Sequence, residues 1–238
     1  MTKFTLNDVT AAFHKGSDSL TQYFAEQGHS DNDMLAAFDE IDQFLSAAEL
    51  AKNAGGEQQT LFNDRGNELV LLIDRLMVFS SQIQHQEIFA YFEQFLYLFC
   101  LWFAREGGVL RQLIPIVNLI AALSNRLREP EELKILLNNI EILMHATEQS
   151  IKDDMDERDP RRPWRVLLLN YAITATRTYD PVLMERSFQY LVNNLPDDIK
   201  QFFTEGMSQM TALNYPEQVK QIMSKYYKRY VSENIKVN

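Results

Sequence analysis

Four arginines that lie close together, Arg158, Arg161, Arg162 and Arg165, are the residues best suited to bind a ligand. Their guanidinium groups present planar forks of N–H donors that fit carboxylates and phosphates. Trp164 lies among them, and the chain as a whole has a net charge of −10, so the positive segment stands out. We therefore predict that these four arginines and Trp164 form an anion-binding edge for a partner protein.

An intramolecular role for the same arginines remains open. The preceding segment 153–159 is rich in Asp and Glu, and so is the helix that we expect near residues 33–52. Ion pairs with either segment would hold the arginines as a clasp within the chain. Trp164 would then be the first buried residue of the following helix.

The acidic segment 153–157 (DDMDE) is a candidate metal site of its own. It resembles the Asp-Asp-x-x-Asp motif with which class I terpenoid synthases, an all-α family, hold Mg²⁺ and diphosphate. That fold needs a second metal motif on a facing helix, and the sequence has none. An EF-hand loop would need its turn glycine where residues 158–160 (RDP) stand. We predict a solvated helix end or linker here, and no metal site.

Residue patterns for catalysis are missing from the sequence. None of the four histidines, His14, His29, His85 and His145, belongs to the Glu-x-x-His pairs of di-iron bundles. Neither a Gly-x-Ser-x-Gly motif nor a glycine-rich phosphate loop occurs. The one cysteine, Cys100, stands in an apolar run, which favours an inert core thiol. We therefore predict no catalytic residues and no cofactor.

A second basic stretch lies near the end of the sequence, over residues 220–229. Tyr226 and Tyr230 are one helical turn apart and fit a core stripe, whereas Lys225, Lys228 and Arg229 would face solvent near a helix end. RNA binding through 158–165 and 220–229 is a weaker alternative. Residues 1–60 carry three Lys against ten Asp and Glu, and an acidic chain repels nucleic acid and anionic lipid.

The elements that position these residues are helices. Apolar residues recur at helical spacing through most of the chain, and six of the seven prolines precede an amphipathic stretch, as is typical of a first helical turn. The eight glycines are few for a β protein of this length. We predict an all-α fold with helices near 5–13, 19–27, 33–52, 60–82, 85–105, 109–127, 131–150, 164–178, 181–194, 197–212 and 216–232.

Short loops between these helices imply antiparallel hairpins, arranged in a bundle or a short α-solenoid. Trp164, Leu167 and Tyr171, followed by Phe188 and Pro196, resemble one tetratricopeptide unit. No second copy occurs at that family's spacing of about 34 residues. The resemblance implies stacked helical hairpins in this part of the chain. We expect one domain over 1–238, with possible subdomains 1–151 and 163–238 joined by 152–162.

Residues 88–103 (IFAYFEQFLYLFCLWF) contain eight aromatic side chains on every face of the predicted helix 85–105. This composition favours a helix surrounded by others, although a homodimer interface would demand the same residues. In the helix before it, Asp74 and Arg75 stand among apolar residues, so at least one of these charges should be partly buried and need a partner.

The sequence does not specify a biochemical activity. Without a catalytic pattern, we expect a non-catalytic protein-interaction or scaffold protein. The main alternative is a small-molecule binder or enzyme with an apolar pocket beside the helix 85–105. The longest uninterrupted apolar run, residues 95–104, is short of the roughly 20 residues of a membrane-spanning helix. With no secretory signal pattern in residues 1–13, we expect a cytoplasmic protein that does not bind membranes.

Overall fold

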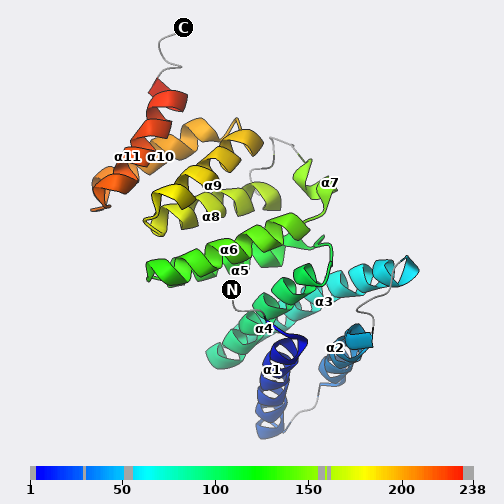
Figure 1. Cartoon of the computed structure of the whole chain (residues 1–238). Helices are drawn as coiled ribbons and strands as arrows, with labels where there is room; N and C mark the ends of the chain where they lie inside the picture. The colour runs from blue at the N-terminus through cyan, green and yellow to red at the C-terminus, as the bar shows by residue number, and fades with distance from the viewer. Residues whose placement is uncertain (1–3, 29–30, 51–55, 155–158, 160–161, 233–238) are drawn as a thin grey trace. The chain divides into compact units, whose positions relative to one another are not determined.

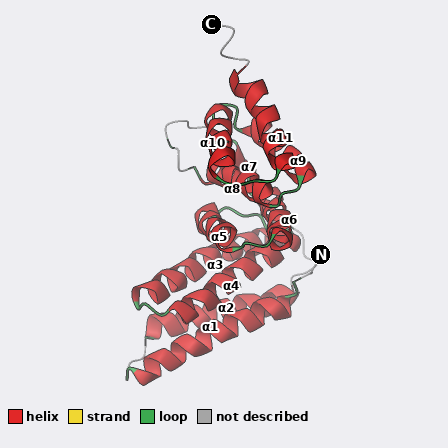
Figure 2. Ribbon diagram, turned by 90° about the vertical axis from the view of Figure 1, so that its left-hand side faces the viewer, coloured by secondary structure: helices red, strands yellow, loops and turns green. Residues whose placement is uncertain are grey.

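The computed structural model describes residues 4–28, 31–50, 56–154, 159 and 162–232. Helices make up 83% of the described residues, and no strand occurs among them, which confirms the all-α fold class (Figures 1 and 2). The helices are α1 (Leu6–Glu26), α2 (Asn32–Leu50), α3 (Glu57–Gln82), α4 (Gln86–Arg105), α5 (Leu113–Arg126), α6 (Pro130–Ala146), α7 (Gln149–Lys152), α8 (Pro163–Arg177), α9 (Pro181–Asn194), α10 (Ile199–Ala212) and α11 (Glu217–Tyr227), followed by a π-helical turn (Lys228–Ser232).

Proline positions fix several helix starts. Helices α6, α8 and α9 begin at Pro130, Pro163 and Pro181, where a missing N–H costs nothing. The Asp180 carboxylate also accepts hydrogen bonds from the first backbone N–H groups of α9. Pro115 lies in the first turn of α5, so it starts that helix late rather than kinking a longer one.

The prediction of two helices at 5–13 and 19–27 was wrong, because α1 runs without a break from Leu6 to Glu26. Gly16, which lies between the two predicted helices, is buried inside α1 against α4. A Cβ atom at Gly16 would lie 2.9 Å from Cε1 of Phe92. The glycine therefore serves close helix packing rather than helix termination.

The chain forms two compact units. The first comprises residues 1–119 and 141–153, and the second comprises 120–140 and 154–238. The boundary between them therefore falls within α5 and within α6.

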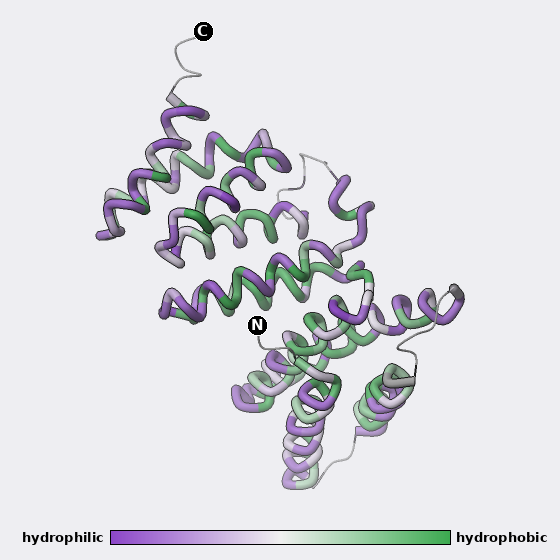
Figure 3. Tube along the Cα trace, viewed as in Figure 1, coloured by the Kyte–Doolittle hydropathy of each residue, from purple (hydrophilic) through white to green (hydrophobic). Residues whose placement is uncertain are grey.

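Helix α4 is the centre of the first unit. Helices α1 and α3 pack against it, and α2 packs against α1 and α3. Its aromatic side chains are largely inside: Phe92, Phe95, Phe99, Trp102 and Phe103 are all fully buried. By length and apolar composition alone α4 could cross a membrane (Figure 3). However, 61% of its apolar window is buried within the protein, as in a core helix.

A hydrogen-bonded asparagine holds the connection between α4 and α5. Asn67 of α3 is buried, and its amide donates to the carbonyl oxygen of Val109 at 2.8 Å. Its carbonyl accepts the backbone N–H groups of Arg111 at 2.7 Å and Gln112 at 3.2 Å. Asn63, one turn earlier, accepts the N–H of Val109 at 2.9 Å. This connection is therefore fixed to α3 although it has no regular secondary structure.

Asp74 lies half-buried on α3, as the sequence predicted for one of the two charges. It makes no hydrogen bond or ion pair with any residue that the structure describes, so the expected partner is not found there. Burial raises the pKa of the Asp74 carboxyl above its ordinary value. Arg75 is exposed.

The second unit contains α8 to α11, in which α8 packs on α9, α10 on α11, and α11 also on α9. Its core includes the rings of Phe188, Phe203 and Tyr226, whose centroids lie 5.2–5.3 Å apart. Tyr226 is buried and Tyr230 is half-buried, which places both near the core stripe that the sequence predicted for them.

Candidate interaction site

The predicted anion-binding edge is only partly described. Arg158 and Arg161 lie outside the described residues. Arg162 precedes α8, and only 7% of it is exposed. Its Nη1 donates to the carbonyl oxygen of Asp154 at 2.9 Å, and its Nε donates to that of Asp159 at 3.2 Å. Arg162 therefore closes the chain on itself through backbone carbonyls rather than through carboxylates.

Arg165 and Trp164 are also engaged within the protein. Arg165 Nε donates to Oδ1 of Asp198 at 2.9 Å, and both side chains are largely buried. Asp198 immediately precedes α10, so this pair ties the start of α8 to the start of α10. Trp164 is buried at the beginning of α8. The described part of the segment thus has the intramolecular contacts of a clasp, with Asp198 as a partner that the sequence did not indicate.

The basic stretch of α11 and of the π-helical turn that follows it lies at the surface. Lys225, Lys228 and Arg229 are exposed, and Lys225 pairs with Glu185 of α9 at 2.6 Å. Lys220, Lys225 and Lys228 border a shallow depression between α10 and α11. Because its lining also includes Glu217, this depression is not uniformly positive.

The second unit has a smaller but more enclosed hollow among α8, α10 and α11, with a volume of about 310 Å³. Its apolar walls include Ile173 of α8, Phe202 and Met210 of α10, and Met223 of α11. Ile173 is 44% exposed, so the wall continues onto the surface. We call this hollow the α8–α10 groove.

Polar groups also line the α8–α10 groove. Arg177 donates to the carbonyl oxygens of Ser124 and Leu127, and it thereby caps the end of α5. Tyr215 packs edge-on against Tyr179, with ring centroids 5.8 Å apart. Burial and the nearby Tyr179 raise the pKa of Tyr215, whereas Arg177 acts in the opposite direction. The Tyr215 hydroxyl makes no hydrogen bond with any described residue, so it is available to a ligand.

In the described part of the chain, no three His, Cys, Asp or Glu side chains come together as potential metal ligands. His14 Nε2 lies 3.1 Å from Oδ1 of Asp42 at the surface. His85 caps α4, since its Nδ1 accepts the N–H of Ile88 at 3.4 Å. Cys100 is buried, and burial raises the pKa of its thiol far above the ordinary value.

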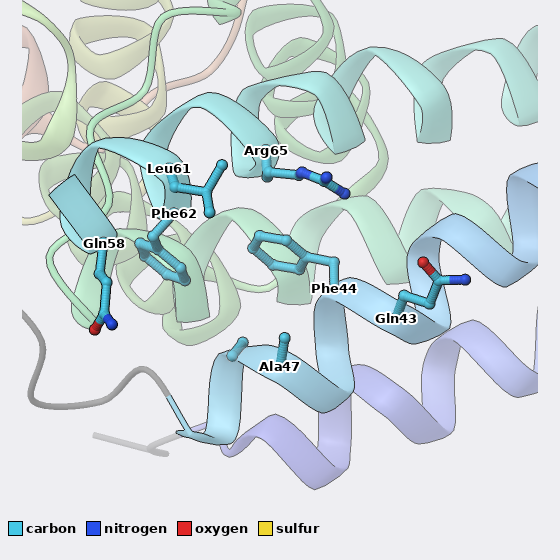
Figure 4. A pocket seen from close by; sticks show the side chains of 8 residues that line it. Gln43, Phe44, Ala47, Gln58, Leu61, Phe62 and Arg65 are labelled. Carbon is cyan, nitrogen blue, oxygen red and sulfur yellow. The ribbon is translucent and has the colours of Figure 1, made fainter.

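The ligand-binding alternative that the sequence suggested beside the helix 85–105 stays a prediction. An apolar pocket in the structure has no described residue of α4 in its lining. It is bordered by α2 and α3 in the first unit and has a volume of about 500 Å³ (Figure 4). The two phenylalanines that line it, Phe44 and Phe62, both contact the ring of Trp102 on α4.

Comparison of the chain with protein-family models, with curated proteins and with solved structures finds no match to any of them.

Proposed function

We propose that this protein is a non-catalytic helical interaction protein, and that the α8–α10 groove is where a partner protein binds. The observation that carries the proposal is the composition of this groove. Phe202 and Tyr215, together with the buried Met210 and Met223, line a hollow that is open to solvent. Aromatic residues, Met and Arg are the types enriched in protein interfaces.

The groove favours a partner segment that offers an apolar side chain next to a hydrogen-bond acceptor. The apolar side chain would fill the hollow between Ile173 and Phe202, where its burial contributes roughly 1.5–3 kcal/mol. The acceptor would take the free hydroxyl hydrogen of Tyr215. Methionines suit such a site because their flexible thioethers adapt to different partner surfaces.

The arginine segment has a different place in this proposal. Arg162 and Arg165 have intramolecular partners, and they are expected to stabilise the beginning of α8. A contact of Arg158 and Arg161 with an anionic group of the partner remains a proposal.

Affinity capture from cell extract tests the groove with a matched pair of variants. Ile173→Lys places a charge at the rim of the groove, whereas Ile135→Lys makes the same change at a 58% exposed isoleucine of α6 that does not line it. We expect one stoichiometric protein to be captured by the wild type and by Ile135→Lys, with at least tenfold less captured by Ile173→Lys. Equal capture by both variants, or no stoichiometric partner with the wild type, would overturn the proposal.

A further inference from the structure

The pocket between α2 and α3 has an apolar interior made by two aromatic rings. Phe44 of α2 and Phe62 of α3 extend toward each other across the gap between the helices, and their rings stack with centroids 5.7 Å apart (Figure 4). Ala47 and Leu61 border the same space, and Leu61 is 57% exposed. An isolated leucine on a surface is ordinary, but here it continues an apolar surface that leads inward.

Behind these rings lies an unused hydrogen-bond donor. Trp102 of α4 is 1% exposed and contacts both Phe44 and Phe62 edge-on, with ring centroids 6.5 and 6.0 Å away. Its indole Nε1 is buried without a hydrogen-bond partner. A buried N–H of this kind is rare in proteins, since leaving it unpaired costs about 1–3 kcal/mol. Trp102 does not line the pocket itself, but its contacts with both phenylalanines make its indole sensitive to changes there.

The rim of the pocket is polar and positively charged. Gln58, Leu61 and Arg65 follow one another at helical spacing on α3, so they lie along one face of that helix. Arg65 is exposed and makes no ion pair or hydrogen bond with any residue that the structure describes. The same holds for the side-chain amides of Gln43 and Gln58. An apolar interior beside a cation and two amides is complementary to an amphipathic anion.

We propose that this pocket binds an amphipathic carboxylate, a ligand with an alkyl chain or aromatic ring and an anionic head. Its apolar part lies against Phe44, Phe62 and Leu61, and its carboxylate pairs with Arg65. The pocket volume of about 500 Å³ is within the range of roughly 300–1,000 Å³ that is usual for small-molecule sites. The proposal is independent of the α8–α10 groove, because all of its residues belong to the first unit.

Trp102 provides a direct readout of this site. The protein has two tryptophans, so replacing Trp164 with Phe leaves Trp102 as the single emitter. Dodecanoate is a suitable probe, and dodecanol is its uncharged counterpart. We expect dodecanoate to change the Trp102 emission saturably, at concentrations below its micelle formation. Dodecanol should bind at least tenfold more weakly, because it cannot pair with Arg65.

A matched pair of arginine variants tests the head-group contact. Arg65→Gln removes the cation at the rim, and Arg75→Gln makes the same change at another exposed arginine of α3 outside the pocket. We expect Arg65→Gln to weaken dodecanoate binding about tenfold and to leave dodecanol binding unchanged, whereas Arg75→Gln should alter neither. The proposal is wrong if dodecanoate gives no saturable change, or if the two variants bind it equally well.

A third variant separates specific binding from general adsorption to apolar surface. Leu61→Glu puts a negative charge on the apolar border of the pocket and should reduce dodecanoate binding by more than tenfold. Val78→Glu is its control, since Val78 is a similarly exposed apolar residue of α3 that does not line the pocket. Equal loss in both variants would show that dodecanoate adsorbs along α3 rather than in the pocket.

Discussion

Replacing Gly66 with Ala is expected to destabilise the first unit, although helix propensity predicts the reverse. Gly66 lies within α3, where Ala would be favoured over Gly by about 1 kcal/mol if nothing else mattered. However, an added Cβ atom would lie 2.2 Å from Cε2 and 2.5 Å from Cζ of Phe103. Carbon atoms in ordinary contact are about 3.5–4 Å apart, so the ring would have to move by more than 1 Å.

The Phe103 ring has little room for this movement. It is fully buried, it stacks on Phe99 at 5.7 Å, and it packs against Phe62 at 4.9 Å. The backbone of Gly108 is also close, because a Cβ atom there would be 2.6 Å from the same ring. Overpacking of this kind costs about 1–3 kcal/mol. We therefore expect a net loss of up to roughly 2 kcal/mol in the free energy of unfolding.

Urea unfolding monitored by Trp102 emission, in the Trp164→Phe background, measures this loss. Combined with Phe103→Leu, which shortens the side chain facing Gly66, the same Gly66→Ala change should become neutral or stabilising by up to about 1 kcal/mol. Gly206→Ala is a useful control, since its nearest neighbour is the flexible end of Met223, so its cost should be small. If the effects of Gly66→Ala and Phe103→Leu add within about 0.5 kcal/mol, the packing argument fails.

Three further outcomes follow from buried groups of the first unit. Asn67→Ala should lower the free energy of unfolding by about 2–4 kcal/mol in urea titrations, because it leaves two backbone N–H groups and one carbonyl without a partner. Asn63→Ala should lower it by only about 1 kcal/mol, because it removes the partner of one N–H group. Equal losses in the two variants would contradict this reasoning. The raised pKa of Asp74 means that its charged form destabilises the folded state. Asp74→Asn should therefore raise the melting temperature at pH 7. This gain should fade as the pH drops below about 4, where the carboxyl is protonated in both the folded and the unfolded state. An unchanged gain at pH 3 would point to another cause. Because its thiol is buried, Cys100 should react slowly with a thiol reagent in the native protein and quickly in urea, whereas rapid native labelling would mean that α4 becomes exposed.

Sequence reasoning succeeded where the determining forces are local or depend on periodicity. Proline in a first helical turn restricts the backbone by itself, so the starts at Pro130, Pro163 and Pro181 could be predicted from neighbouring residues alone. The burial of α4 followed from aromatic side chains on all its faces, because a helix with no polar face must be surrounded.

The contacts that the sequence did not predict join residues that are far apart in the chain. The close packing of Gly16 depends on Phe92, 76 residues later, which the periodicity of α1 cannot reveal. Likewise, Asp198 was visible as an acid in a first turn, yet its pairing with Arg165, 33 residues away, required the packing of the second unit. A charge pattern shows that a positive segment needs partners, and the fold determines which partners it has.

The two candidate sites differ in how they could have been found from the sequence. The groove of the second unit combines residues of α8, α10 and α11, none of which is unusual for a helix that packs on its neighbours. For the first unit the sequence suggested only an apolar space beside the helix 85–105, whereas the pocket found there is lined by residues of α2 and α3. Its specificity rests on Arg65, an exposed arginine that resembles many others in the sequence. Arg65 differs from Arg75 in its position, one turn after Leu61 and Phe62, at the edge of an aromatic interior. The comparison of Arg65→Gln with Arg75→Gln tests whether this position matters for binding.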